Sequence, residues 1–308
     1  MFSENTMQKF EKLGYRFVGP SKHSAVKICT WTKHSLRDKK RIGGKENFCY
    51  KQKFYGISSH RCVQMTPSLF CTERCEFCWR PSDVKAPKWV GKADEPSEIL
   101  DECIKYQANL LQGFRSIVKD KIKMHEAEHP KHFAISLDGE PLMYPKINAM
   151  IEEIARRRMT SFIVTNGTLS GVVEDLTEPT QLYITLPASN EEIYEKTCRP
   201  LVGDAWAKIN RSLMMLSSFS CNTVVRLTLV RKLNMAHPEQ YAKIIDRTNP
   251  KFVEVKSFMS VGAARERLSY ERMPLHDEIK EFAEKISSES GYKVRDEKRD
   301  SRVVLLTR

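Results

Sequence analysis

The chain has 308 residues, 41% hydrophobic and 29% charged, which is typical of a globular protein and excludes disorder, collagen repeats and coiled coils. No apolar run approaches the roughly 18 residues of a membrane helix, and the N-terminus lacks a signal-peptide core, so we expect a cytoplasmic protein. Lys and Arg number 51 against 39 Asp and Glu, a net charge of +12. Nucleic acid is therefore a candidate partner.

The nine cysteines are unevenly distributed along the chain. Six of them fall within its first 78 residues: Cys29, Cys49, Cys62, Cys71, Cys75 and Cys78. Reducing compartments disfavour structural disulfides. The crowding of thiols therefore predicts metal binding, with two groups of three available.

The predicted elements follow one another in a regular rhythm after residue 63. Residues 1–63 read as an irregular, basic, cysteine-bearing extension. The strand-like runs are 64–70, 132–137, 161–166, 181–187, 223–230 and 252–258, and the helical patterns are 95–112, 145–158, 204–218, 238–247 and 276–288. Residues 119–132 are expected to be an exposed charged helix or loop.

Alternation of strands and helices predicts an α/β fold of parallel βα units joined by right-handed connections. We expect a partial (βα)6 TIM-like barrel over 64–290, with the N-terminal extension before it. A C-terminal β extension, 291–308, would add a hairpin. Such sheets bind ligands at the carboxyl ends of their strands.

The segment CTERCEFCW directly follows the first predicted strand and places Cys71, Cys75 and Cys78 in C-x3-C-x2-C spacing. Three thiolates at this spacing can ligate three irons of a 4Fe–4S cluster and leave the fourth iron open for chemistry. Zinc is the simpler alternative, but no histidine follows at the usual short distance. The pattern resembles the signature of the radical S-adenosylmethionine (SAM) superfamily.

Polar residues after later strands are consistent with that resemblance. DGEP follows the second strand, and its Gly139, Glu140 and Pro141 resemble the family's motif that meets the SAM amino group, although these are also common turn pairs. The resemblance implies further SAM contacts after the third, fourth and sixth strands, through Asn166, Thr185, Ser189 and Met259.

A narrower resemblance rests on CYKQKFYG and HRC upstream, together with CTERCEFCWRP, AISLDGEPLMYP, FIVTNGT and VEVKSFM in collinear order. From about residue 10 to its C-terminus the chain resembles the archaeal tRNA 4-demethylwyosine synthases. The family implies a lyase that condenses N1-methylguanosine-37 of tRNA(Phe) with pyruvate, an early step towards wybutosine-type bases. A 5′-deoxyadenosyl radical takes a hydrogen from the N1-methyl group, whose carbon then attacks pyruvate.

The same family implies a second, auxiliary 4Fe–4S cluster on Cys29, Cys49 and Cys62, with pyruvate bound at its open iron. One alternative is that these are three unrelated buried thiols. Another is that Cys198 replaces Cys29 as a ligand, because Cys29 precedes a basic insert-like loop. Lys51 matches the family position proposed to form a Schiff base with pyruvate. It would otherwise contribute only charge.

Basic residues in the same segment predict contacts with tRNA phosphates. They are Lys33, Arg37, Lys39, Lys40, Arg41 and Lys45. Residues 156–158, with 265 and 267, are further candidates. The target guanine would leave its stack to reach the site, and the candidates to stack on it are Trp31, Tyr50, Phe54, Tyr55 and Trp79.

Eukaryotic relatives carry an added flavodoxin-like domain, for which this chain is too short. We therefore expect a separate flavodoxin- or ferredoxin-like protein to donate the electrons. We also expect the chain itself to be a monomer. Two rival interpretations remain: another radical SAM enzyme that modifies RNA or protein, and a zinc-stabilised RNA-binding protein without catalysis. Metal analysis separates the second, because it predicts zinc.

Overall fold

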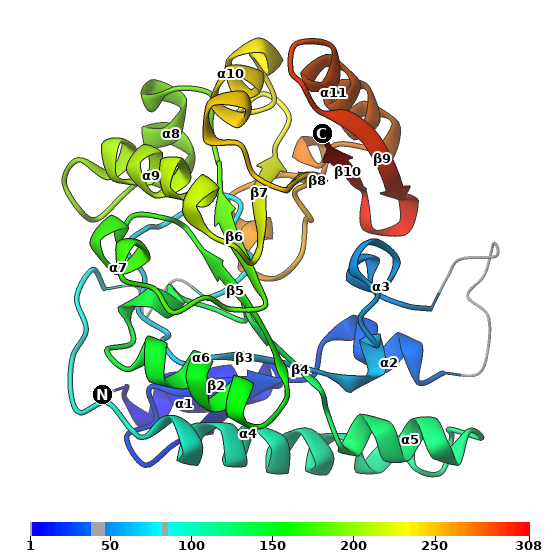
Figure 1. Cartoon of the computed structure of the whole chain (residues 1–308). Helices are drawn as coiled ribbons and strands as arrows, with labels where there is room; N and C mark the ends of the chain where they lie inside the picture. Colours follow the sequence, from blue (N-terminus) through cyan, green and yellow to red (C-terminus); the bar gives the residue numbers. More distant parts are fainter. Residues whose placement is uncertain (1, 38–46, 82–85) are drawn as a thin grey trace. The chain divides into compact units, whose positions relative to one another are not determined.

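The computed structural model describes residues 2–37, 47–81 and 86–308. The chain divides into two compact units. We call Met1–Leu69 with Trp89–Ile163 unit 1, and Phe70–Lys88 with Val164–Arg308 unit 2. Figure 1 shows both, coloured along the sequence.

Unit 1 contains strands in the order β1-β2-β3-β4-β5. Their bounds are Arg16–Val18, Ser24–Lys27, Cys62–Thr66, His132–Ile135 and Thr160–Thr165. The ladder is antiparallel from β1 to β3 and parallel from β3 to β5. The expectation of an irregular N-terminal extension is therefore wrong, because β2 pairs along the free edge of β3 and continues its sheet.

The helices of unit 1 are α1 to α6. Their bounds are Glu4–Lys12, Thr30–Ser35, Tyr50–Tyr55, Pro96–Leu111, Lys121–Glu128 and Ile147–Arg156. In Figure 1, α4 runs along the strands at the start of the sheet and continues towards α5. The charged segment 119–132 contains α5, which is anchored because Met124 and Ala127 are buried in one cluster with Ile28 and Leu36.

Unit 2 contains β6 (Gln181–Thr185), β7 (Asn222–Leu229) and β8 (Phe252–Ser257), which are parallel neighbours. β10 (Val303–Thr307) lies antiparallel to β8 and pairs with β9 (Lys293–Lys298), so the predicted C-terminal hairpin is confirmed. The helices α7 to α11 are Ser170–Glu174, Glu191–Cys198, Ala205–Met214, Pro238–Thr248 and His276–Ser288. α11 packs on β8, β9 and β10 (Figure 1).

The six predicted βα strands correspond to β3–β8, and the five predicted helices to α4, α6, α9, α10 and α11. β3 ends at Thr66, earlier than expected, because Pro67 cannot donate to a ladder. Among the described residues, no helix combines the length and apolarity required to traverse a bilayer.

Candidate cluster and substrate sites

The loop that carries Cys71, Cys75 and Cys78 is held along one side by the end of α8 in the same unit. All three thiols are partly exposed. The Arg74 amide donates to the Cys198 carbonyl at 3.0 Å, and the Glu76 amide to that of Thr197 at 2.8 Å. These backbone bonds fix the loop independently of any metal.

The segment after β8 holds the other side of the loop. Gly262 has φ +57°, and a Cβ there would lie 2.3 Å from the Trp79 carbonyl oxygen. The Ala263 amide donates to that same oxygen at 3.1 Å. Arg267 donates to the carbonyls of Glu76 and Cys78. Close approach at this point therefore requires glycine.

Two residues predicted to contact SAM belong to the same unit as this loop. Asn166 adjoins the loop, and Ser189 follows strand β6. The Asn166 amide donates to the Thr72 hydroxyl at 2.8 Å and lies 3.9 Å from Cys71 Sγ. Ser189, after β6, is 4% exposed, and its Oγ has no hydrogen-bond partner among the described residues. A buried hydroxyl without a partner is costly unless a ligand supplies one.

The other SAM candidates of unit 2 have less distinctive surroundings. Thr185, the last residue of β6, is partly exposed. Met259 is partly buried against the apolar cluster around Phe258. The partly exposed thiols of the loop fit an iron–sulfur cluster. Thr185, Met259 and the Ser189 hydroxyl fit a ligand with polar and apolar parts.

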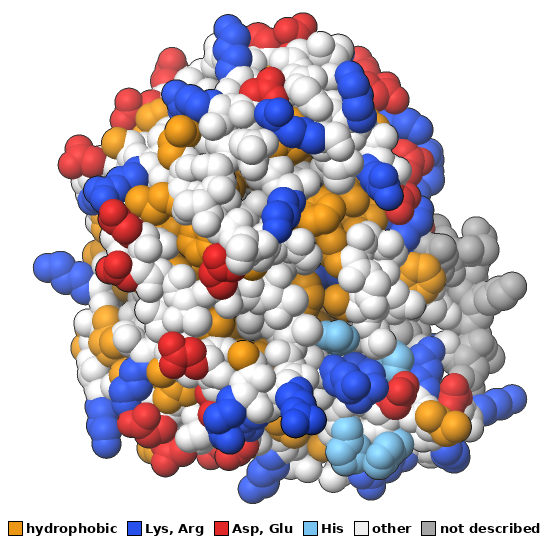
Figure 2. All heavy atoms as spheres, in the orientation of Figure 1, with side chains coloured by type: hydrophobic (Ala, Val, Ile, Leu, Met, Phe, Trp, Pro, Cys, Tyr) orange, Lys and Arg blue, Asp and Glu red, His pale blue; other side chains and the backbone are white. Residues whose placement is uncertain are grey.

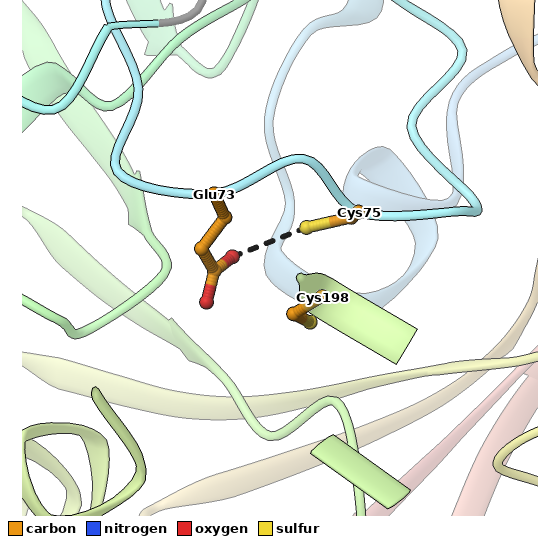
Figure 3. Close-up of side chains that lie close together, drawn as sticks. All are labelled: Glu73, Cys75 and Cys198. Atoms are coloured by element: carbon orange, nitrogen blue, oxygen red, sulfur yellow. Dashed lines mark hydrogen bonds between the residues drawn. The ribbon is translucent and has the colours of Figure 1, made fainter. Parts of the chain in front are cut away.

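Two side chains of the loop, Glu73 and Cys75, converge with Cys198 at the end of α8, and the three groups, which could hold a metal, lie within 4.8 Å of one another (Figure 3). Cys75 Sγ donates to Glu73 Oε2 at 3.1 Å, and the Tyr194 hydroxyl donates to Glu73 Oε1 at 2.8 Å. The neighbouring Cys198 thiol and burial hold the pKa of Cys75 well above its usual value. Burial raises the pKa of Cys198 to about 12.

Sequence reasoning missed Glu73 and Tyr194 and considered Cys198 only as a replacement for Cys29. The only signal was the i, i+4 spacing of Tyr194 and Cys198, which places them on one helix face. The Cys198 thiol lies near Cys75 and Glu73, inside unit 2.

The three upstream cysteines and Lys51 come together in unit 1. Cys29 precedes α2, Cys49 precedes α3 and Cys62 begins β3. Burial raises the pKa of Cys62 to about 12, Cys29 and Cys49 raise it further, and Lys51 opposes them. Metal binding would replace the thiol protons outright, so this partly buried set of thiols fits a metal cluster.

Hydrogen bonds hold these elements in place. The Cys49 amide donates to Ser59 Oγ at 2.9 Å, and Thr32 Oγ1 donates to the Ser59 carbonyl at 3.0 Å. The Gln107 amide donates to the Cys62 carbonyl at 3.3 Å. Lys51, 8% exposed, points its Nζ at the Phe162 ring, 4.8 Å from the centroid.

The DGEP turn after β4 also belongs to unit 1. Gly139 adopts φ +64°, and Asp138 accepts from its amide at 2.7 Å. Glu140 is 1% exposed and accepts from the Leu142 amide at 3.0 Å, just ahead of Pro141. The segment is thus a tight turn that buries a carboxylate.

Of the predicted RNA contacts, Lys33 and Arg37 are exposed at and just after α2. Lys39, Lys40, Arg41 and Lys45 lie outside the described residues. Around α5 in unit 1, Figure 2 shows histidine side chains among Lys and Arg side chains.

The further basic candidates and the aromatics are partly engaged elsewhere. Arg156 and Arg157 both pair with Glu153 at 2.7 Å, so their charge is partly neutralised. Tyr50 is buried, whereas Trp79 is 40% exposed, with the Arg80 guanidinium 3.2 Å from its ring centroid.

Comparison with known proteins gives two family matches: the radical SAM superfamily over residues 65–245, and wyosine base formation over 247–308. A SAM-dependent tRNA 4-demethylwyosine synthase of Pyrococcus abyssi is 45% identical over 99% of this chain and 89% of its own. One of Oryza sativa is 39% identical over 97% of this chain and 45% of its own.

Solved structures agree with these matches. A structure of TYW1 with a lysine–pyruvate adduct bound has 36% identity and a TM-score of 0.86, covering 100% of this chain and 96% of that one. A crystal structure of archaeal TYW1 has 32% identity and a TM-score of 0.79, with the same coverage.

The predicted α/β fold of the radical SAM type is thereby confirmed, and that superfamily implies SAM and one 4Fe–4S cluster. The similarity also sets aside a non-catalytic zinc protein and an unrelated radical SAM enzyme. The chain belongs to the radical SAM family of tRNA 4-demethylwyosine synthases.

Proposed function

We propose that this chain is a lyase that condenses N1-methylguanosine-37 of tRNA(Phe) with pyruvate to form 4-demethylwyosine. The observation that carries the proposal is the pair of cysteine triads, one in each unit, with Lys51 beside the triad of unit 1. The family match over nearly the whole chain supports it.

Cys71, Cys75 and Cys78 would ligate the cluster at which SAM binds. When bound, cluster and SAM supply the 5′-deoxyadenosyl radical that takes a hydrogen from the N1-methyl group. Asn166 and Ser189 would hold polar groups of SAM and Met259 would contact its adenine. We also assign Thr185 to the SAM site, with Gly139, Glu140 and Pro141 meeting the SAM amino group. This assignment is supported by the unpartnered Ser189 hydroxyl and by the Asn166 bond to the cysteine loop.

Cys29, Cys49 and Cys62 would hold a second 4Fe–4S cluster, and Lys51 would bind pyruvate covalently. Its amine adds to the ketone carbon and water leaves, giving an imine that fixes the acceptor carbon. The burial of Lys51 beside the thiols supports this role, as does the lysine–pyruvate adduct described for a TYW1 structure of 36% identity.

The tRNA would be held by Lys33 and Arg37, which are exposed within α2 and just after its last residue. We assign Lys39, Lys40, Arg41 and Lys45 to the same contact. Phosphate contacts of this kind give affinity that falls with salt. A flavodoxin- or ferredoxin-like protein would deliver the electrons to a monomeric enzyme.

The test is an anaerobic reaction of reconstituted protein with SAM, reductant, N1-methylguanosine-containing tRNA(Phe) and pyruvate labelled with ¹³C at carbon 3. Mass analysis of the digested nucleosides should show a product that gains two carbons and carries the label. Formation of 5′-deoxyadenosine without a labelled nucleoside would leave the superfamily intact and refute the substrate. Omitting pyruvate is the control.

A further inference from the structure

The helix α5 of unit 1 and its flanks carry lysines that the proposed function does not use. We propose that this segment is a second tRNA-binding surface, which binds the phosphate backbone of the double-stranded stem next to the anticodon loop. Lys121, Lys123 and Lys131 would make the contacts. The inference rests on the proposed tRNA substrate.

The acidic side chains of this segment are all engaged by neighbours in the same unit. Asp120 caps the first turn of α5 through a backbone amide. Arg61 donates to Glu126 at 3.2 Å, and Arg115 donates to Glu128 at 2.6 Å. These carboxylates therefore repel a phosphate less than unpaired ones would.

The three lysines have no such neutralising partner. Lys121 donates to the carbonyls of Arg115 and Val118 at 3.1 and 3.3 Å, which leaves its positive charge intact. Within the described part of the chain, no carboxylate forms an ion pair with Lys121, Lys123 or Lys131. Figure 2 shows Lys, Arg and His side chains over this part of unit 1. A surface with unpaired cations fits a polyanion.

Buried contacts fix α5 to the part of unit 1 that holds the upstream cysteines. Met124 lies in one buried cluster with Leu36, which directly follows α2. Arg61 immediately precedes Cys62 and donates to the carbonyl of His129, just after the end of α5, at 3.2 Å. The lysines are therefore held at a set position relative to α2 and to the triad of unit 1.

This position favours a stem of the tRNA over its anticodon loop. In the proposed reaction nucleotide 37 enters the site, so the loop is engaged there and by Lys33 and Arg37. A cationic surface that continues from α2 then meets the duplex that continues from the loop. Duplex RNA is recognised mainly through its phosphates and 2′-hydroxyls, and lysine binds phosphate without requiring one fixed geometry.

The experiment measures the binding of two RNAs to full-length, anaerobically reconstituted protein. One is intact tRNA(Phe), and the other is a single-stranded oligonucleotide of its anticodon loop, both with N1-methylguanosine. The triple variant Lys121→Gln, Lys123→Gln and Lys131→Gln removes the charges and keeps polar side chains. It should bind the tRNA about 10-fold more weakly at low salt, with a slope of log affinity against log salt shallower by about three. The oligonucleotide should bind as it does to wild type.

Two controls separate a binding surface from general effects. Ile122→Ser changes α5 at a side chain that is 77% exposed and alters no charge. The triple variant Lys232→Gln, Lys243→Gln and Lys293→Gln removes the same charge from exposed positions of unit 2. Both should bind both RNAs as wild type does, and an equal loss of tRNA affinity in either control would overturn the inference.

Unchanged tRNA binding by the α5 triple variant, or an equal loss for the two RNAs, also overturns the inference and leaves the proposed function standing. If the triple variant does not fold, Lys123→Gln with Lys131→Gln decides, with an expected change of about two in the slope. Failure of wild type to bind either RNA would instead refute the proposed substrate.

Discussion

The two cysteine triads are built in opposite ways. Unit 2 supplies its triad from a single loop, clamped between the end of α8 and the turn after β8. Unit 1 gathers Cys29, Cys49 and Cys62 from the starts of two short helices and a strand. A loop triad is fixed by local spacing and its supports, whereas a gathered triad exists only once its unit has folded. We therefore expect the two to respond differently to substitution.

The largest effect should follow removal of the loop triad. Replacing Cys71, Cys75 and Cys78 by Ala should abolish cleavage of SAM, because no other described group is proposed to bind the iron that meets it. Measurement of 5′-deoxyadenosine by chromatography, with dithionite as reductant, checks this. Cleavage of SAM at the wild-type rate would show that the loop is not required for radical formation.

Lys51→Arg should separate radical formation from product formation. Arginine keeps the positive charge but does not form an imine, so the nucleoside product should fall by at least about 100-fold, while 5′-deoxyadenosine persists. Borohydride should trap pyruvate on the wild-type peptide that contains Lys51 and not on the variant. Lys53→Ala, an exposed lysine of the same helix, should behave as wild type. A trapped adduct in Lys51→Arg would place the imine elsewhere.

Gly262→Ala should loosen the clamp on the loop triad without touching the gathered triad. The added Cβ meets the Trp79 carbonyl at 2.3 Å and strains a left-handed backbone, which should lower the free energy of unfolding by about 1–3 kcal/mol. Gly171→Ala is the control, since nothing lies within 4 Å and the residue is helical. Denaturant unfolding measures both, and equal stability of the two variants would contradict the clamp.

The smallest effect should come from the exposed charges near Cys29. The double variant Lys33→Ala with Arg37→Ala should weaken tRNA binding a few-fold. The slope of log affinity against log salt concentration should become shallower by about two, the number of phosphate contacts removed. The pair Lys243→Ala with Lys293→Ala removes the same charge from exposed positions of unit 2. If both pairs weaken binding equally, the effect is one of net charge and not of a site.

The same contrast explains what could be predicted from the sequence. The C-x3-C-x2-C spacing and the apolar runs of β4–β8 are local patterns, so the loop triad and the parallel strands were predicted. β1 and β2 span only three and four residues, and α2 and α3 six each, too short for a periodic signal. Tyr194 and Glu73 meet across 121 residues of sequence, a contact that only the fold creates.

The decisive measurement is made on the gathered triad. In a variant with Cys29, Cys49 and Cys62 replaced by Ala, iron per chain, 5′-deoxyadenosine and modified nucleoside are determined in one anaerobic preparation. Two separate clusters predict loss of about half the iron, residual uncoupled SAM cleavage and no 4-demethylwyosine. Full iron content in this variant, or unimpaired product, would contradict the assignment of a second cluster to unit 1.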